Sequence, residues 1–272
     1  MILFGKPKNP EDVIYQAMAF LERKQPKAAI TLFNQALKAD PKNIQALYNK
    51  GLALNQIRKY QDAITSFDKV LEIKPEDAPS LNNRAIALGE MGNPEDAEKY
   101  YDKAIKADSK YATAYYNKGV LYDKIGKQEE ALGILDEAIK IEPKNSSSRF
   151  YKGIVLGKLN RHEEALNCFT NICHAHPQHM DALFHKGIEL AEIGKHKQAL
   201  EIFDKLLAKH KKNVNVTYAK SRSLAAVGQI EQSLELLKHA ISQNRKVIKK
   251  WVEHEKIFDK LQDDERFKKI IK

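Results

Sequence analysis

A period of 34 residues constrains the fold of this chain more than any other feature of its sequence. Starting at Pro10, seven segments of 34 residues fit the 272-residue chain without a gap. They span residues 10–43, 44–77, 78–111, 112–145, 146–179, 180–213 and 214–247. Self-similarity at a period of this length is typical of proteins in which one small structural unit is stacked on the next.

Small and large apolar residues recur at fixed places within the segments. The eighth place is always small: Ala17, Gly51, Ala85, Gly119, Gly153, Gly187 and Ser221. The twentieth place is alanine in six segments and serine in the seventh, and the twenty-fourth is always large and apolar or aromatic. These spacings predict two helices in each segment, with small residues at places 8 and 20 facing each other so that the helices approach closely. Glycine at the fifteenth place of four segments predicts the turn between them.

With this pattern the chain resembles the tetratricopeptide repeat family. The resemblance covers residues 10–247 and implies an all-α fold, an α-solenoid in which stacked helix-turn-helix repeats form a right-handed superhelix. Residues 248–272 keep the register for one more helix, expected to run to about Lys260, and are predicted to form capping helices that cover the apolar end of the array. Residues 1–9 are predicted to form a flexible N-terminus, unless Ile2, Leu3 and Phe4 pack on the first repeat.

The first helices of stacked pairs are expected to line a concave groove, which is the candidate binding surface. The fifth and sixth places point into this groove and carry mainly aromatic and amide side chains. The predicted groove residues are Tyr48, Asn49, Asn83, Tyr116, Asn117, Phe150, Tyr151, Phe184, His185 and Tyr218.

Asparagine occupies the sixth place of three successive segments, as Asn49, Asn83 and Asn117. An amide both donates and accepts hydrogen bonds, so such a row can hold the backbone of an extended peptide while aromatic neighbours bury its apolar groups. Some members of the resembled family hold peptides in this way. The alternative is that these amides bond only within or between repeats. The principal hypothesis is a non-catalytic protein-protein interaction scaffold that binds a peptide or helical segment of a partner protein.

Charge is unevenly distributed along the chain. Residues 10–145 carry 20 basic and 21 acidic side chains, whereas residues 146–272 carry 24 basic and 15 acidic ones. A cationic half favours an acidic partner, although a solvated lysine-rich face has the same composition. The candidate contacts for an acidic partner are Lys124, Lys158, Arg222, Lys249 and Lys256. The alternative function is binding of RNA or another polyanion through residues 146–272, with Phe150, Phe184 and Tyr218 stacking on bases.

Basic residues also occupy the seventh place of six segments, and the twenty-fifth place is aspartate in four. Salt pairing between adjacent helices is the favoured interpretation of this pattern, ahead of phosphate binding.

Several other classes of function are disfavoured. No phosphate-binding loop, dinucleotide fingerprint, nucleophile elbow or zinc-protease motif occurs, so neither catalysis nor a cofactor is predicted. The apolar runs are too short for membrane insertion, and two cysteines, Cys168 and Cys173, favour a cytoplasmic location. The histidine-rich segment 173–179 matches no closed metal site, so no metal is predicted. Self-association through an apolar edge stays open.

Overall fold

The computed structural model describes residues 9–272. Within this range sixteen α-helices and one 3-10 helix follow one another, and no strand occurs among these residues, which confirms the predicted all-α fold. The predicted behaviour of the N-terminal segment lies outside the described residues, except for Asn9. The Asn9 side chain accepts a hydrogen bond from the Asp12 backbone N–H at 2.8 Å and so begins the first helix.

The described chain folds into seven helix pairs, and each 34-residue segment holds one pair. The first helices are α1 (Pro10–Glu22), α3 (Ile44–Gln56), α5 (Ala78–Glu90), α7 (Ala112–Lys124), α9 (Ser146–Lys158), α11 (Met180–Glu192) and α13 (Val214–Ala226). The second helices are α2 (Pro26–Ala39), α4 (Tyr60–Ile73), α6 (Pro94–Ala107), α8 (Gln128–Ile141), α10 (His162–Ala175), α12 (His196–Lys209) and α14 (Ile230–Gln243). The pairs are followed by α15 (Arg245–Glu253), η1 (Lys256–Leu261) and α16 (Glu265–Ile271).

The turn within a pair requires a left-handed residue at the fifteenth place. Glycine provides it in four pairs, for example Gly92 with a φ of 83°. Lys24, Arg58 and Asn160 adopt the same conformation in three other pairs, with φ between 57° and 60°. The backbone geometry of the repeat therefore persists where glycine is absent.

The small residue at the eighth place makes room for the large one at the twenty-fourth place of the same pair. A Cβ atom on Gly51 would lie 2.5 Å from the Phe67 ring, and one on Gly187 would lie 2.6 Å from the Phe203 ring. Both phenylalanines are fully buried. Places 8 and 20 also face each other as expected, since the Ser233 hydroxyl donates to the Ser221 carbonyl oxygen at 2.8 Å.

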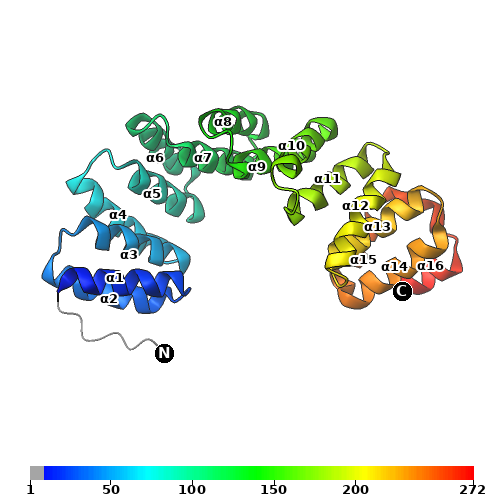
Figure 1. Ribbon diagram of the computed structural model, residues 1–272, viewed down its shortest axis with the longest axis horizontal. Helices are drawn as coiled ribbons and strands as arrows, with labels where there is room; N and C mark the ends of the chain where they lie inside the picture. The colour runs from blue at the N-terminus through cyan, green and yellow to red at the C-terminus, as the bar shows by residue number, and fades with distance from the viewer. Residues whose placement is uncertain (1–8) are drawn as a thin grey trace. The chain divides into compact units, whose positions relative to one another are not determined.

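The chain divides into two compact units at Asn145. Figure 1 labels the helices of each unit in their order along the chain. The first unit contains α1–α8, and the second, Ser146–Lys272, contains α9–α16. This boundary coincides with the change from balanced to basic composition along the sequence. Within each unit, each helix of the repeat pairs packs against the next along the chain, and α15 and α16 both pack on α14.

The last helices of the second unit cover the end of its repeats. Ile248, Phe258 and Phe267 are fully buried and form one apolar cluster with Leu237 and other residues of the seventh pair. The single helix expected to run to about Lys260 was wrong in detail: α15 ends at Glu253, and η1 follows it. The segment that breaks the repeat pattern thus shields the last apolar face from water.

Candidate functional site

In the first unit, the fifth, sixth and ninth places of α3, α5 and α7 form one surface, which we call the first-helix face. Its half-buried members include Tyr48, Asn49, Leu52, Asn83, Ile86, Tyr116, Asn117 and Val120. Contacts between α3 and α5 and between α5 and α7 align these side chains from one repeat to the next.

Each asparagine amide in the row on the first-helix face donates at least one hydrogen bond inside the protein. Asn49 donates from Nδ2 to the Gln45 carbonyl oxygen at 2.8 Å, one turn back along α3. Asn83 donates from Nδ2 to the Pro79 carbonyl oxygen at 2.8 Å and to the Tyr48 hydroxyl oxygen at 3.1 Å. These bonds fit the alternative interpretation of the asparagine row, in which the amides bond within and between repeats.

Asn117 completes this network through a residue that the sequence pattern did not suggest. Its Nδ2 donates to Oδ1 of Asn82 at 2.9 Å, across the contact between α7 and α5. Asn82 is 2% exposed and stands at the fifth place, where Tyr48 and Tyr116 are aromatic. This departure from the repeat pattern was the signal that could have identified it. Asn117 Oδ1 stays available as an acceptor.

Tyr48 and Asn83 together offer one donor and one acceptor. Since the Tyr48 oxygen accepts from Asn83, its own proton points elsewhere and can be donated. Burial is the main cause that raises the pKa of Tyr48 to about 12, so the hydroxyl keeps this proton at neutral pH. With Oδ1 of Asn83 as the acceptor, this pair matches the C=O and N–H of a peptide unit.

A pocket of about 170 Å³ opens between α5 and α7 on the first-helix face. Ile86 and Val120 provide apolar walls, and Asn117 lies beside them. Lys124 also lines this pocket, but its Nζ pairs with Oε1 of Glu90 at 2.6 Å. Lys124 is therefore not the uncompensated cation that the sequence suggested for an acidic partner.

In the second unit the predicted groove residues pack on one another. The His185 ring stacks on Phe169 at 5.2 Å between centroids and meets Phe150 and Phe184 edge-on, each at 5.4 Å. Phe150 also stacks on His179 at 5.7 Å. Burial lowers the pKa of His185 and favours its neutral form. Tyr151 lies half-buried on α9.

The protein's own C-terminal segment packs on Tyr218 and Arg222, which corrects the prediction of Tyr218 as a groove residue and of Arg222 as a contact for an acidic partner. Tyr218 is 7% exposed and contacts the rings of Trp251 and Phe258, with centroids 5.2 and 6.4 Å away. Arg222 pairs with Glu192 at 2.8 Å and with Glu255 of the C-terminal segment. Tyr218 is therefore closed to a partner while this segment is in place, and Arg222, whose side chain is 19% exposed, already pairs with two carboxylates.

The other predicted cations differ in their environments. Lys249 donates from Nζ to the Lys272 carbonyl oxygen at 2.8 Å, whereas Lys158 and Lys256 are exposed. A cationic pocket that the sequence did not reveal, of about 470 Å³, lies between α14 and α16. Its cations are Lys238, Arg245, Arg266 and Lys269. They come from three helices, α14, α15 and α16, which explains why no run of charge in the sequence marked them.

Salt pairs link the seventh place of one repeat to the twenty-fifth place of the preceding one, which confirms that prediction. Arg84 pairs with Asp68 at 2.6 Å, Lys118 with Asp102 at 2.6 Å and Lys220 with Asp204 at 2.5 Å. Each pair joins a first helix to the second helix before it, so these charges hold neighbouring repeats together.

Two further findings concern metals and membranes. Among residues 9–272, no group of three or more histidine, cysteine, aspartate or glutamate side chains is arranged to hold a metal ion. The His179 ring instead accepts a hydrogen bond from the Ala182 backbone N–H at 3.2 Å and begins α11. None of the helices in the described part of the chain has the length and apolar character needed to span a bilayer.

The sequence profile of the tetratricopeptide repeat family matches residues 16–78, 82–146 and 152–214. The chain belongs to the tetratricopeptide repeat family. This confirms the resemblance inferred from the 34-residue period. No curated protein matches the sequence.

Several solved structures are similar to this tetratricopeptide repeat protein. One is a tetratricopeptide repeat protein from Parabacteroides merdae, with 20% identity and a TM-score of 0.63, covering 91% of this chain and 98% of that one. YrrB, described as a TPR protein with an unusual peptide-binding site, is 29% identical, with a TM-score of 0.57 and coverage of 66% and 92%. PilW, a type IV pilus biogenesis factor, is 23% identical, with a TM-score of 0.68 and coverage of 76% and 96%.

Proposed function

We propose that this protein is a non-catalytic scaffold that binds a peptide segment of a partner protein on the first-helix face of its first unit. The observation that carries the proposal is the combination, on one face, of peptide-like hydrogen-bonding groups with an apolar pocket. Tyr48 and Asn83 offer a donor and an acceptor, and Ile86 and Val120 line the pocket between α5 and α7. The peptide backbone would bond to Tyr48 and Asn83, while one apolar side chain of the peptide enters the pocket between α5 and α7.

The comparison with YrrB supports this proposal. YrrB is described as having a peptide-binding site and shares 29% of its residues with this chain over the matched region. The asparagine row keeps a role in the proposal, but as hydrogen-bond acceptors and not as groups that both donate to and accept from the peptide. Asn49, Asn83 and Asn117 would present their carbonyl oxygens to backbone N–H groups of the peptide.

The proposal is tested by selecting peptides from a display library on the full chain and measuring their affinities for variants. Val120→Lys places a charge in the apolar pocket and is expected to weaken binding by about tenfold or more. Replacing Asn49, Asn83 and Asn117 together by alanine removes three acceptors, and a loss of about tenfold or more is expected.

Gly133→Lys is the matched control, because it also adds one lysine. Gly133 is exposed on the second helix α8, and a Cβ atom there meets nothing within 4 Å. This variant should bind the selected peptides as the unmodified protein does. If Val120→Lys and the triple variant also leave the affinities unchanged while remaining folded, the first-helix face is not the binding surface.

A second candidate function, binding of RNA or another polyanion by the second unit, is favoured by the cationic pocket between α14 and α16. Base stacking by Phe150, Phe184 and Tyr218 receives little support, because these rings contact other rings of the protein. The candidate is therefore restricted to backbone phosphates. Lys269→Glu should weaken polyanion binding, and the affinity should fall steeply as salt rises; a salt-independent affinity would contradict it.

The remaining parts of the proposal concern location and assembly. The proposal of a cytoplasmic location rests on the two cysteines, Cys168 and Cys173, which form no disulfide with each other. Self-association stays a prediction, and light scattering over a dilution series tests it.

A further inference from the structure

A larger pocket in the first unit lies on a different side of α3 from the first-helix face. It has a volume of about 440 Å³ and is lined by residues of α2, α3 and α4, together with Pro41 and Lys59 from the connecting turns. Its α3 residue Lys50 is two positions from Tyr48 and from Leu52, which is about 200° around a helix. The pocket and the first-helix face can therefore be changed independently.

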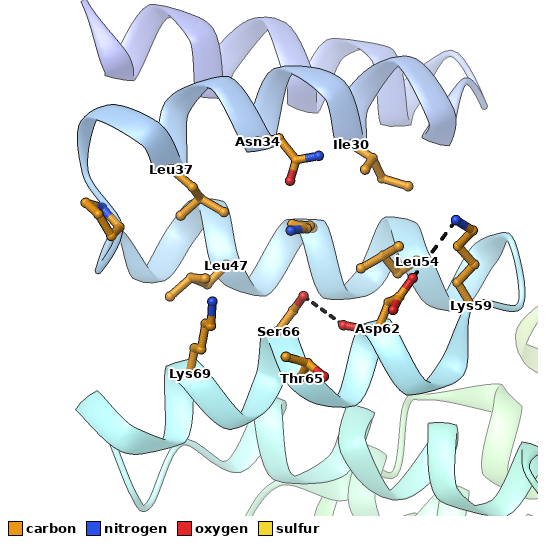
Figure 2. A pocket seen from close by; sticks show the side chains of 12 residues that line it. Ile30, Asn34, Leu37, Leu47, Leu54, Lys59, Asp62, Thr65, Ser66 and Lys69 are labelled. Carbon is orange, nitrogen blue, oxygen red and sulfur yellow. Dashed lines mark hydrogen bonds and ion pairs between the residues drawn. The ribbon is translucent and has the colours of Figure 1, made fainter.

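The pocket combines an apolar base with an excess of positive charge. Ile30, Leu37, Leu47 and Leu54 supply the apolar surface. Figure 2 shows Asn34 on α2 and Lys69 on α4 directed toward the space between these helices. The charged residues in the lining are Lys50, Lys59, Lys69 and Asp62, and the carboxylate of Asp62 lies 4.0 Å from Nζ of Lys59. Lys50 and Lys69 thus remain as two cations at the pocket.

Comparison with the other repeats shows what this pocket lacks. Lys118 stands at the same place as Lys50, and its Nζ pairs at 2.6 Å with Asp102 on the preceding second helix. The residue that corresponds to Asp102 in the first repeat is Asn34, which carries no charge. Burial lowers the pKa of Lys50 and the positive charge of Lys69 lowers it further, while the negative charge of Asp62 opposes this shift only in part. Lys50 is thus a half-buried cation whose usual carboxylate is missing from the repeat.

We propose that the pocket between α2 and α4 binds an acidic side chain of a partner protein, together with an aliphatic side chain next to it in the partner's sequence. The partner's carboxylate bonds to Lys50 and Lys69. It takes the position that corresponds to Asp102, which pairs with Lys118 between the third and fourth repeats. The aliphatic side chain packs on Leu47 and Leu54. This site is additional to the proposed peptide surface and does not depend on it.

The test uses two small blocked peptides and inorganic phosphate as probes on the full chain. Binding is followed by the NMR signals of lysines labelled with ¹³C at Cε. Acetyl-Leu-Glu-amide should shift the Lys50 and Lys69 signals saturably, and acetyl-Leu-Gln-amide, which lacks only the charge, should bind about tenfold more weakly. Equal affinity of the two peptides, or tighter binding of phosphate than of the glutamate peptide, would overturn the proposal.

Asn34→Asp supplies the missing carboxylate from within the protein. It should weaken binding of the glutamate peptide by about tenfold or more, because Lys50 then has an internal partner. Thr170→Asp is the matched control, since Thr170 stands at the equivalent place of α10 in the second unit and should leave binding unchanged. Unchanged affinity in Asn34→Asp would also overturn the proposal. Val120→Lys should not affect this binding, so failure of the two proposals can be distinguished.

Discussion

In the first unit, three of the four first helices carry asparagine at the sixth place, whereas the second unit carries Tyr151, His185 and Ala219 there. The consequence is visible in their contacts. The asparagines bond to neighbouring backbone and side chains and leave carbonyl oxygens for a partner, whereas the His185 ring packs between other aromatic rings. The same backbone repeat therefore supports a polar surface in one unit and an aromatic cluster in the other.

The units differ also in how their first helices are covered. The C-terminal segment places Trp251, Glu255 and Phe258 against Tyr218 and Arg222 of α13. In the first unit, the corresponding side of α5 and α7 keeps an open pocket. Repetition of sequence thus does not imply repetition of accessible surface, because a segment outside the repeats decides what stays exposed.

The largest expected effect tests whether the two units are stabilised separately. Phe67→Ala in the first unit and Phe203→Ala in the second each remove a fully buried ring that packs on a glycine, at a cost of about 3–5 kcal/mol. Because a repeat contacts mainly its neighbours, amide hydrogen exchange should accelerate mostly within the unit that carries the substitution. Equal loss of protection in both units would show that they unfold as one.

A smaller effect is expected where the C-terminal segment meets α13. Arg222→Leu removes the cation between Glu192 and Glu255, and the loss should be about 2 kcal/mol, since these groups are only partly shielded from water. Trp251, the only tryptophan, packs against Tyr218 with its ring tilted by 52°, so its fluorescence should report the release of the segment at lower denaturant concentration.

Arg266→Leu provides the comparison for this experiment. Arg266 pairs with Asp264 and Glu231, but its side chain is 54% exposed. Its loss should therefore change stability much less than the loss of Arg222 does. If both arginine variants have the same effect, the network around Arg222 does not hold the C-terminal segment.

The salt pairs between repeats allow a finer comparison of the units. Lys118 in the first unit is 9% exposed and Lys220 in the second is 23% exposed, and each pairs with an aspartate. Lys118→Gln should cost about 1 kcal/mol and Lys220→Gln less, because water screens the second pair more strongly. Urea denaturation of both variants measures this, and a larger loss for Lys220→Gln would contradict the explanation by burial.

The repeat register predicted the fold in detail, since each first helix begins at the first residue of its 34-residue segment. Accessibility at Tyr218 could not be predicted, because residues 248–272 keep the repeat register for only one helix and do not complete a second helix that would reveal how they pack. The asparagine row was identified, but its side-chain rotamers decide whether an amide donates to the preceding helical turn or to a ligand. The sequence shows asparagine instead of aspartate at position 34. Only the structure shows that Asn34 and Lys50 line the same pocket, so that Lys50 lacks the carboxylate found in other repeats.

The smallest expected effect is on the pH dependence of stability, for which the two units differ in their histidine content. All nine histidines follow residue 160, so the second unit alone contains groups with an ordinary pKa near neutrality. Burial lowers the pKa of His185 below its usual value of 6.5. As pH falls through that value, the unfolded chain takes up a proton that the folded chain resists, so stability declines and then levels off below the folded-state pKa.

His185→Asn introduces asparagine at the sixth place of a repeat in the second unit, where three repeats of the first unit already carry it. The difference in unfolding free energy between this variant and the unmodified protein should change as pH is lowered from neutrality, because the variant lacks that titration. Urea unfolding at several pH values measures it, with Asn83→Ala in the first unit as a control whose difference should not vary over this range. A constant difference for His185→Asn would mean that the ring is protonated as easily in the folded chain as in the unfolded one, and that the aromatic cluster does not exclude its charge.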